Sequence, residues 1–325
     1  MAIPKQPPMT LLLFALITLS LATTSNAVDC VGAGAISVYW GQKSEATEGT
    51  LESVCASENY NIVILESLLV YDDGTTPVLN LAGHCGSDTY PCSKLQPQIE
   101  YCQKNKIKVF LSIGQDEIVK ARNRHSKSDP TSAEQLASYL LENYLSGQPG
   151  PLGNVSLDGI DIADVADGEN LKWAEVVKAI NASTSARKIY LSASPQCVYP
   201  DYYLGNAIST GLFDYIWVEF FYQNPCIYAN NDASNLLKEW SKWTKHVPKS
   251  SIFLGLVASH DIAGYISPEA LISKVLPTVK KASKSNYTAQ IKGNITKNCR
   301  CVCDGDAFAS NGFYGLGSAS LRLSA

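Results

Sequence analysis

One short stretch, residues 157–165, combines a buried-strand pattern with regularly spaced carboxylates. Asp158 and Asp161 are followed by Ala163 and Val165 at the alternate positions. Because side chains alternate between the two faces of a strand, Asp161, Ala163 and Val165 are predicted to point to one face. Barrel enzymes place their acids and bases at the carboxyl ends of parallel strands. The stretch therefore has the position for proton-transfer chemistry, but two of its three inward positions are apolar.

Neighbouring carboxylates are poor substitutes for those two positions. Asp164 is one residue out of step, so it is predicted to turn to the opposite face of the strand. Asp167 and Glu169 lie in the following loop. Rescue of the missing acid by these residues is not favoured.

The stretch resembles the Asp-Gly-x-Asp-x-Asp-x-Glu signature of glycoside hydrolase family 18, in its plant class III chitinase branch. The resemblance covers roughly residues 35–281, because further family motifs follow in order. Those motifs lie at 38–42, 81–85, 108–114, 194–197 and 213–218.

The resemblance implies a defined chemistry, which this sequence has lost. In the family, the final Glu protonates the glycosidic oxygen. The Asp two residues earlier orients the substrate acetamide, whose oxygen is the nucleophile. These two positions fall on Val165 and Ala163, while the first two Asp fall on Asp158 and Asp161. General acid–base catalysis contributes ~10²–10⁴-fold, so we expect no enzyme activity. Asp158 and Asp161 are expected to remain as hydrogen-bonding residues at the strand end.

The resemblance also implies positions that contact carbohydrate. Glu219 stands where the family usually has Gln or a similar polar residue. The family's Tyr after the sixth strand falls on Phe221, with Tyr222 one place further on. The bulky loop 114–117 and the missing floor Trp of the family pocket oppose sugar binding. The candidates for carbohydrate binding are Tyr39, Gln42, Asp161, Glu219, Phe221 and Tyr222.

The elements needed to position these residues alternate between strands and helices. Apolar strand-like runs and helix-like segments recur through the 325 residues, which predicts a single (β/α)8 TIM barrel over residues 28–325. Strands are expected at 35–40, 61–70, 108–113, 188–193, 215–220 and 252–257, besides the motif. Helices are expected at 50–56, with Thr50 as cap, and at 132–145, 171–180, 236–243 and 268–275.

The C-terminal strand and tail diverge from the family from about residue 287. The eighth strand should be apolar and end in a Trp, but residues 289–293 are half polar and Gly293 falls about where that Trp would lie. Two explanations stay open. Either the barrel closes differently, or the tail is an artefact of splicing or gene prediction.

Residues 1–27 have the features of a signal peptide. Lys5 precedes an apolar run at 11–21, and small residues at 25–27 suit cleavage. We expect a secreted protein, extracellular in the apoplast or in the vacuole. The net charge of −4 without a basic run argues against nucleic acid or an anionic membrane as partner. The sequons that suggest a glycoprotein are at Asn154, Asn181, Asn286 and Asn294.

The ten cysteines fit an oxidising compartment. The resemblance implies the disulfides Cys55–Cys102, Cys85–Cys92 and Cys197–Cys226. The pairing of the other four stays open, although disulfides are favoured over a metal site in a secreted chain. These four are Cys30, Cys299, Cys301 and Cys303.

Fold does not determine function, and several functions are compatible with this sequence. The preferred interpretation is a monomeric, cofactor-free chitinase-like lectin that binds N-acetylglucosamine or chitin oligosaccharides in plant defence. The main alternative is an inhibitor of a foreign glycoside hydrolase, a xylanase or α-amylase. A seed storage protein follows, and a residually active chitinase is the least favoured.

Overall fold

The computed structural model describes residues 35–70, 76–114, 133–163, 173–183, 187–222, 225–282 and 289–292. The expected signal peptide, the loop 114–117 beyond Gly114, Val165, Asn286, Asn294 and the four remaining cysteines lie outside these residues.

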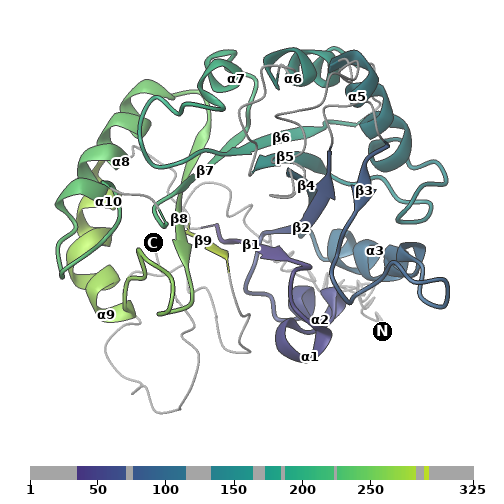
Figure 1. The fold of residues 1–325 in the computed structure, drawn as a ribbon, viewed down its shortest axis with the longest axis horizontal. Helices are drawn as coiled ribbons and strands as arrows, with labels where there is room; N and C mark the ends of the chain where they lie inside the picture. The colour runs from purple at the N-terminus through teal and green to yellow at the C-terminus, as the bar shows by residue number, and fades with distance from the viewer. Residues whose placement is uncertain are drawn as a thin grey trace, which may run out of the picture.

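Eight parallel strands form a closed barrel, as predicted (Figure 1). Closure is visible in the pairing, because β1 is hydrogen-bonded to β2 on one side and to β9 on the other. A short ninth strand, β3 (Val78–Leu79), pairs antiparallel with the end of β2. The barrel strands are β1 (Ser37–Trp40), β2 (Ile62–Leu69), β4 (Lys108–Gly114), β5 (Gly159–Ala163), β6 (Tyr190–Ser194), β7 (Tyr215–Glu219), β8 (Ser251–Val257) and β9 (Ala289–Lys292).

The half-polar segment at 289–292 serves as the last barrel strand. Gln290 of β9 lies opposite Ser37 of β1 and Gly255 of β8, and Ile291 lies opposite Val38 and Leu256. The chain therefore closes the barrel in the usual order despite its unusual composition. The rest of the tail lies outside the described residues.

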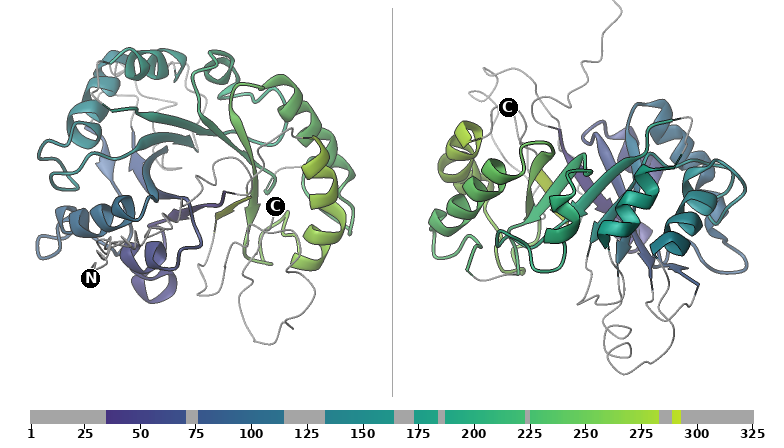
Figure 2. Two further views of the ribbon diagram at one scale, coloured as in Figure 1. Left: turned by 180° about the vertical axis from the view of Figure 1, so that it is seen from behind. Right: turned by 90° about the horizontal axis from the view of Figure 1, so that it is seen from above.

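Helices cover the outside of the barrel (Figure 2). The Thr50 side chain caps α2 by accepting a hydrogen bond from the Ser53 amide, as expected. The helix expected at 132–145 is α5 followed by a π-helical turn at Leu141–Leu145, and the helix from Pro268 has a similar turn at Leu271–Val275. The helices are α1 (Glu45–Glu48), α2 (Leu51–Ala56), α3 (Gln96–Lys104), α5 (Ala133–Leu140), α6 (Trp173–Asn181), α7 (Gly205–Ser209), α8 (Ser234–His246), α9 (Pro268–Ala270) and α10 (Leu276–Ala282).

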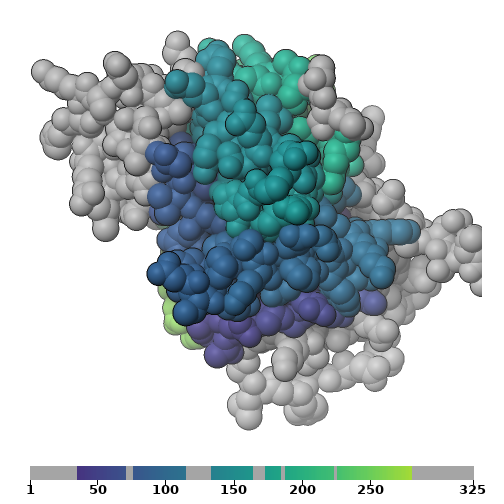
Figure 3. Space-filling model, turned by 90° about the vertical axis from the view of Figure 1, so that its right-hand side faces the viewer, coloured from purple at the N-terminus to yellow at the C-terminus, as the bar shows by residue number. Residues whose placement is uncertain are grey.

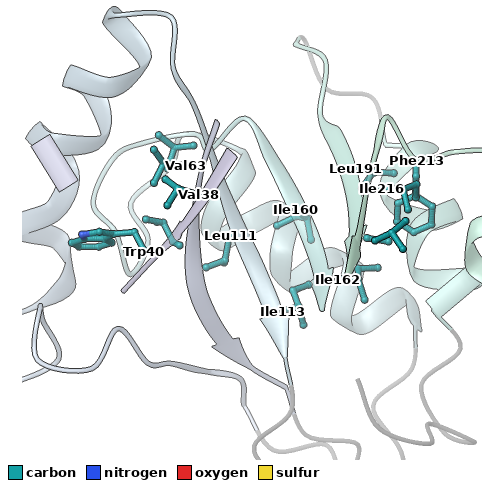
Figure 4. Close-up of a cluster of buried hydrophobic side chains, with 14 of the residues drawn as sticks. Val38, Trp40, Val63, Leu111, Ile113, Ile160, Ile162, Leu191, Phe213 and Ile216 are labelled. Carbon is teal, nitrogen blue, oxygen red and sulfur yellow. The ribbon is translucent and has the colours of Figure 1, made fainter. Parts of the chain in front are cut away.

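The main hydrophobic core lies between the barrel and its helices. Outward-facing residues of neighbouring strands, such as Val38, Leu111 and Ile160, belong to it (Figure 4). Trp173, Trp240 and Trp243 are buried there, as expected for helix-to-barrel packing. Segments of the N-terminal half, coloured purple to teal, form one continuous outer face (Figure 3).

Three disulfides have the pairing that the resemblance implied. They join Cys55 to Cys102, Cys85 to Cys92, and Cys197 to Cys226. The first ties α2 to α3, and the third ties the loop after β6 to the loop after β7. Each bridge typically stabilises a fold by ~2–4 kcal/mol.

Candidate functional site

Asp161 lies inside the barrel near the middle of β5, and its side chain is fully buried. Both carboxylate oxygens accept hydrogen bonds from hydroxyl groups, which come from the neighbouring strands β4 and β6 and from β1. Because a buried carboxylate is stable only when its lone pairs are satisfied, this network fixes Asp161 in place. The donors are Tyr39 Oη of β1 (2.7 Å), Ser112 Oγ of β4 (3.1 Å), and Ser192 Oγ (2.7 Å) and Ser194 Oγ (3.3 Å) of β6.

Tyr39 joins this network and is also buried. Its hydroxyl is hydrogen-bonded to Ser194 as well as to Asp161. Burial raises the pKa of Tyr39 well above its usual value, and the nearby charges of Asp161 and Glu219 raise it further. Tyr39 therefore stays protonated and keeps its hydroxyl as a hydrogen-bonding group.

Ala163 follows Asp161 on the same inner face, as the strand period predicted. It is buried at the end of β5, and its partner in the neighbouring strand is Ser194. A methyl group therefore occupies the step of β5 nearest the barrel mouth. Val165, two residues further, lies outside the described residues.

Asp158 is separated from this network and acts at the opposite end of β5. Its carboxylate accepts hydrogen bonds from the Val109 amide (2.8 Å) and Gln103 Nε2 (2.9 Å), and pairs with Arg187 at 2.5 Å. These contacts join α3, β4 and the segment that precedes β6. Asp158 is thus a structural residue at the amino end of its strand, where the family's chemistry does not take place.

Gln42 and Glu219 lie at the carboxyl ends of their strands. The Gln42 side chain is exposed, and its Nε2 donates to the carbonyl oxygens of Glu66 (2.6 Å) and Asn80 (3.1 Å). Glu219 is the last residue of β7 and is almost buried. Glu219 pairs with Gln196, two residues beyond Ser194 of the Asp161 network, and its charge contributes to the raised pKa of Tyr39.

Phe221 and Tyr222 follow β7 and differ sharply in exposure. Phe221 is 1% exposed, and Tyr222 is 64% exposed. Gly264 packs directly against Phe221, since a Cβ added there would lie 2.8 Å from the Phe221 Cα. At the family's Tyr position, Phe221 therefore faces the interior, while the adjacent hydroxyl of Tyr222 is displayed to solvent.

Sequence reasoning did not find the serines of the network. Ser112 interrupts the apolar run of β4, and Ser192 and Ser194 alternate within β6. The sequence could have indicated them, because each is a polar residue at an inward-facing position of an otherwise buried strand. It did not indicate which acceptor the three hydroxyls share.

A second polar cluster fixes the loop that carries Gln42. The buried Glu48 carboxylate accepts hydrogen bonds from the amides of Gly41 (3.0 Å) and Lys43 (2.9 Å). His84 Nε2 lies 2.8 Å from the same carboxylate oxygen. Both side chains are buried, so they act as an internal brace for the loop after β1.

Within the described ranges, no group of three His, Cys, Asp or Glu side chains is arranged to hold a metal ion. In the same part of the chain, none of the helices has the length and apolar character to cross a membrane.

Comparison with known proteins identifies the family. The sequence matches glycosyl hydrolases family 18 over residues 35–286. The chain belongs to this family. The acidic endochitinase of Nicotiana tabacum is 40% identical over 279 residues, which cover 81% of this chain and 93% of that protein.

Solved structures similar to this chain include proteins named as a lectin and as a hydrolase inhibitor. The tamarind chitinase-like lectin is 44% identical, with a TM-score of 0.72, and the match covers 80% of this chain and 94% of that one. The xylanase and α-amylase inhibitor protein of Scadoxus multiflorus is 33% identical, with a TM-score of 0.66 and coverage of 79% and 93%. This chain is therefore similar both to a protein named as a chitinase and to proteins named as a lectin or an inhibitor.

Proposed function

We propose that this protein is a catalytically inactive member of family 18 that acts as a lectin for N-acetylglucosamine or chitin oligosaccharides in plant defence. The observation that carries the proposal is the buried methyl group of Ala163 beside Ser194. In the family signature this position holds the carboxylate that orients the acetamide. Neither Ala163 nor Val165 can give or take a proton.

The residues that remain suit binding rather than cleavage. Tyr39 is held by Asp161 and Ser194, so its ring and hydroxyl are fixed before a ligand arrives. Preorganised groups lose little conformational freedom on binding. Gln42 follows the carboxyl end of β1, and Glu219 ends β7. The similarity to a chitinase-like lectin supports the same choice.

We further infer that the protein is secreted and glycosylated. The signal-like segment at 1–27 supports secretion. Asn154 and Asn181 are exposed, which suits sugar attachment at these two sequons. Mass spectrometry of the protein from its native tissue tests both inferences.

The lectin function is tested by two measurements on the same preparation. Isothermal titration with chitotetraose should give saturable heat, and this heat should be weakened in Tyr39→Phe. Incubation with colloidal chitin should release no reducing ends. Reducing ends released at ordinary chitinase turnover would overturn the inactive assignment, and the absence of heat would overturn the lectin assignment.

Restoring the two lost acids sharpens the test. Ala163→Asp combined with Val165→Glu should still give a poor chitinase, because Phe221 stands at the family's Tyr position and Gln115, Asp116 and Glu117 add bulk and charge to a loop that is Gly-rich in the family. A matched single variant, Ala163→Asp, controls for the added charge. Strong hydrolysis by the double variant would show that only the two acids are missing.

Inhibition of a foreign hydrolase is the second candidate, favoured by the similarity to the xylanase and α-amylase inhibitor. Such contacts would use outer loops and helices and do not require an open barrel mouth. Assays with a fungal xylanase and an α-amylase separate the two functions. Inhibition without sugar binding supports the inhibitor function. If the protein neither binds the sugar nor inhibits the hydrolases, a storage role is supported.

A further inference from the structure

An exposed aromatic surface lies outside the barrel mouth. The loop from β6 to α7 displays Val198, Tyr202 and Tyr203, which are 43%, 80% and 36% exposed. The two tyrosine rings meet edge to face, with their centroids 5.0 Å apart. We refer to these three residues as the tyrosine platform. Large apolar side chains grouped on a surface commonly mark a binding site.

The loop backbone beneath the platform is fixed by a buried carboxylate. Asp201 accepts hydrogen bonds from the amides of Gln196 (2.9 Å), Tyr203 (2.9 Å) and Leu204 (2.5 Å). Burial raises the pKa of Asp201, and these three bonds oppose that rise. The carboxylate therefore points inward and holds the turn that presents both rings.

The beginning of the same loop is anchored separately. The Cys197–Cys226 disulfide joins it to the loop after β7. The Cys197 carbonyl accepts a hydrogen bond from Trp243 Nε1 at 2.9 Å, and the Tyr199 amide donates to the Glu239 carboxylate at 3.2 Å. A loop held at both ends loses little freedom when a ligand binds to it.

The charge of this region favours a neutral ligand. Residues 195–206 contain one charged side chain, Asp201, and it is buried. Residues 225–232 of the adjoining loop contain only Asp232. The surface offers tyrosine rings, hydroxyls and amides. A sugar ring presents C–H groups on its faces and hydroxyls at its rim, so it complements tyrosine, which is apolar on its face and polar at its tip.

The platform lies at the same end of the barrel as the Asp161 network. Ser194, which joins that network, ends β6, and the platform loop begins at the next residue. Gln196 also bridges to Glu219 at the end of β7. We propose that the tyrosine platform is a second contact surface for a neutral N-acetylglucosamine polymer, outside the barrel mouth. The ligand class rests on the proposed lectin function, but the surface and its residues are separate from it.

Retention on colloidal chitin tests the platform. The double variant Tyr202→Ala, Tyr203→Ala should lose about tenfold in affinity for the polymer, since two aromatic contacts are removed. Its affinity for chitotetraose should stay unchanged if that short sugar fills the mouth alone. The control is Tyr90→Ala, another exposed tyrosine, which lies in a distant loop and contacts Lys94. Tyr90→Ala should be retained like the unmodified protein.

The outcomes separate the platform from the mouth. If the double variant is retained normally while Tyr39→Phe is weakened, the platform proposal is wrong and the lectin function stands. Loss of retention in the double variant with no effect of Tyr39→Phe supports the platform and refutes binding in the mouth. Equal losses in Tyr90→Ala and the double variant, or no retention of the unmodified protein, overturn the platform. Loss of xylanase or amylase inhibition with normal chitin retention also overturns it in favour of a protein partner.

Discussion

Inside the barrel, one region is filled by packed aromatic rings, whereas another gathers hydroxyl groups around the buried carboxylate of Asp161. Trp217 packs between Tyr215 (5.5 Å between ring centroids) and Phe253 (3.8 Å), and Phe110 lies 6.0 Å from Tyr215. In the second region, Asp161 accepts hydrogen bonds from its hydroxyl donors. The stability of the aromatic region depends on how well its side chains fill the space, and the stability of the polar region depends on its hydrogen-bond partners.

The signature stretch contributes to both regions. Gly159 lies in the aromatic region, where an added Cβ would come within 2.4 Å of the Tyr190 carbonyl oxygen and 2.9 Å of the Phe110 ring. Asp161, two residues later, centres the polar region. Gly159, which packs inside the barrel, and Asp161, which is hydrogen-bonded there, therefore both match the signature. The resemblance to the family signature aligns the two positions that would contact the reacting sugar with Ala163 and Val165.

The largest effect is expected in the aromatic region. Trp217→Ala should lower the free energy of unfolding by ~3–5 kcal/mol, because a fully buried indole leaves a cavity. Trp217→Phe keeps a ring and should cost clearly less. Urea denaturation of both variants measures the difference. A cost below about 1 kcal/mol for Trp217→Ala would show that this region does not depend on volume.

A smaller loss is expected in the polar region. Asp161→Ala should cost ~2–3 kcal/mol, because hydroxyls of Tyr39, Ser112 and Ser192 lose their buried acceptor. Asp161→Asn can still accept and donate, and should retain more stability. Both are measured by the same denaturation assay. If Asp161→Ala were as stable as the unmodified protein, the polar region would have no role in stability.

The smallest effect concerns alkaline pH. The folded pKa of Tyr39 is raised, so above about pH 10 the unfolded chain loses this proton before the folded chain does. The unfolded state then binds fewer protons, and stability falls as the pH rises. Tyr39→Phe removes this contribution, so the stability gap between the two proteins should narrow by on the order of 1 kcal/mol per pH unit above pH 10. Denaturation of both proteins at several pH values measures this difference. A difference in unfolding free energy that stays constant from pH 9 to pH 11 would contradict the prediction.

Local patterns predicted much of the fold. The period of two in residues 157–165 placed Asp161 and Ala163 on one inward face, and the cap at Thr50 began α2 where expected. The role of residues 289–292 was left open, because their half-polar composition matched no strand template. Their strand is defined by pairing with β1 and β8, and β1 lies about 250 residues earlier in the chain.

The candidate site was predicted less completely than the barrel. Tyr39 and Asp161 were singled out and lie in hydrogen-bond contact. Ser112, Ser192 and Ser194 were not, because a hydroxyl in an apolar strand has many possible partners. The exposure of Tyr202 likewise depends on how Asp201 folds the loop beneath it.

The sequence alone determined the strand period, the resemblance to the family and the apolar residues at two signature positions, because each of these is read from residue type and local spacing. The tertiary structure decided that Asp161 is shared among four strands, that β9 closes the barrel, and that two tyrosines stand on the surface. These features depend on contacts between distant segments, and such contacts exist only after the chain has buried its core.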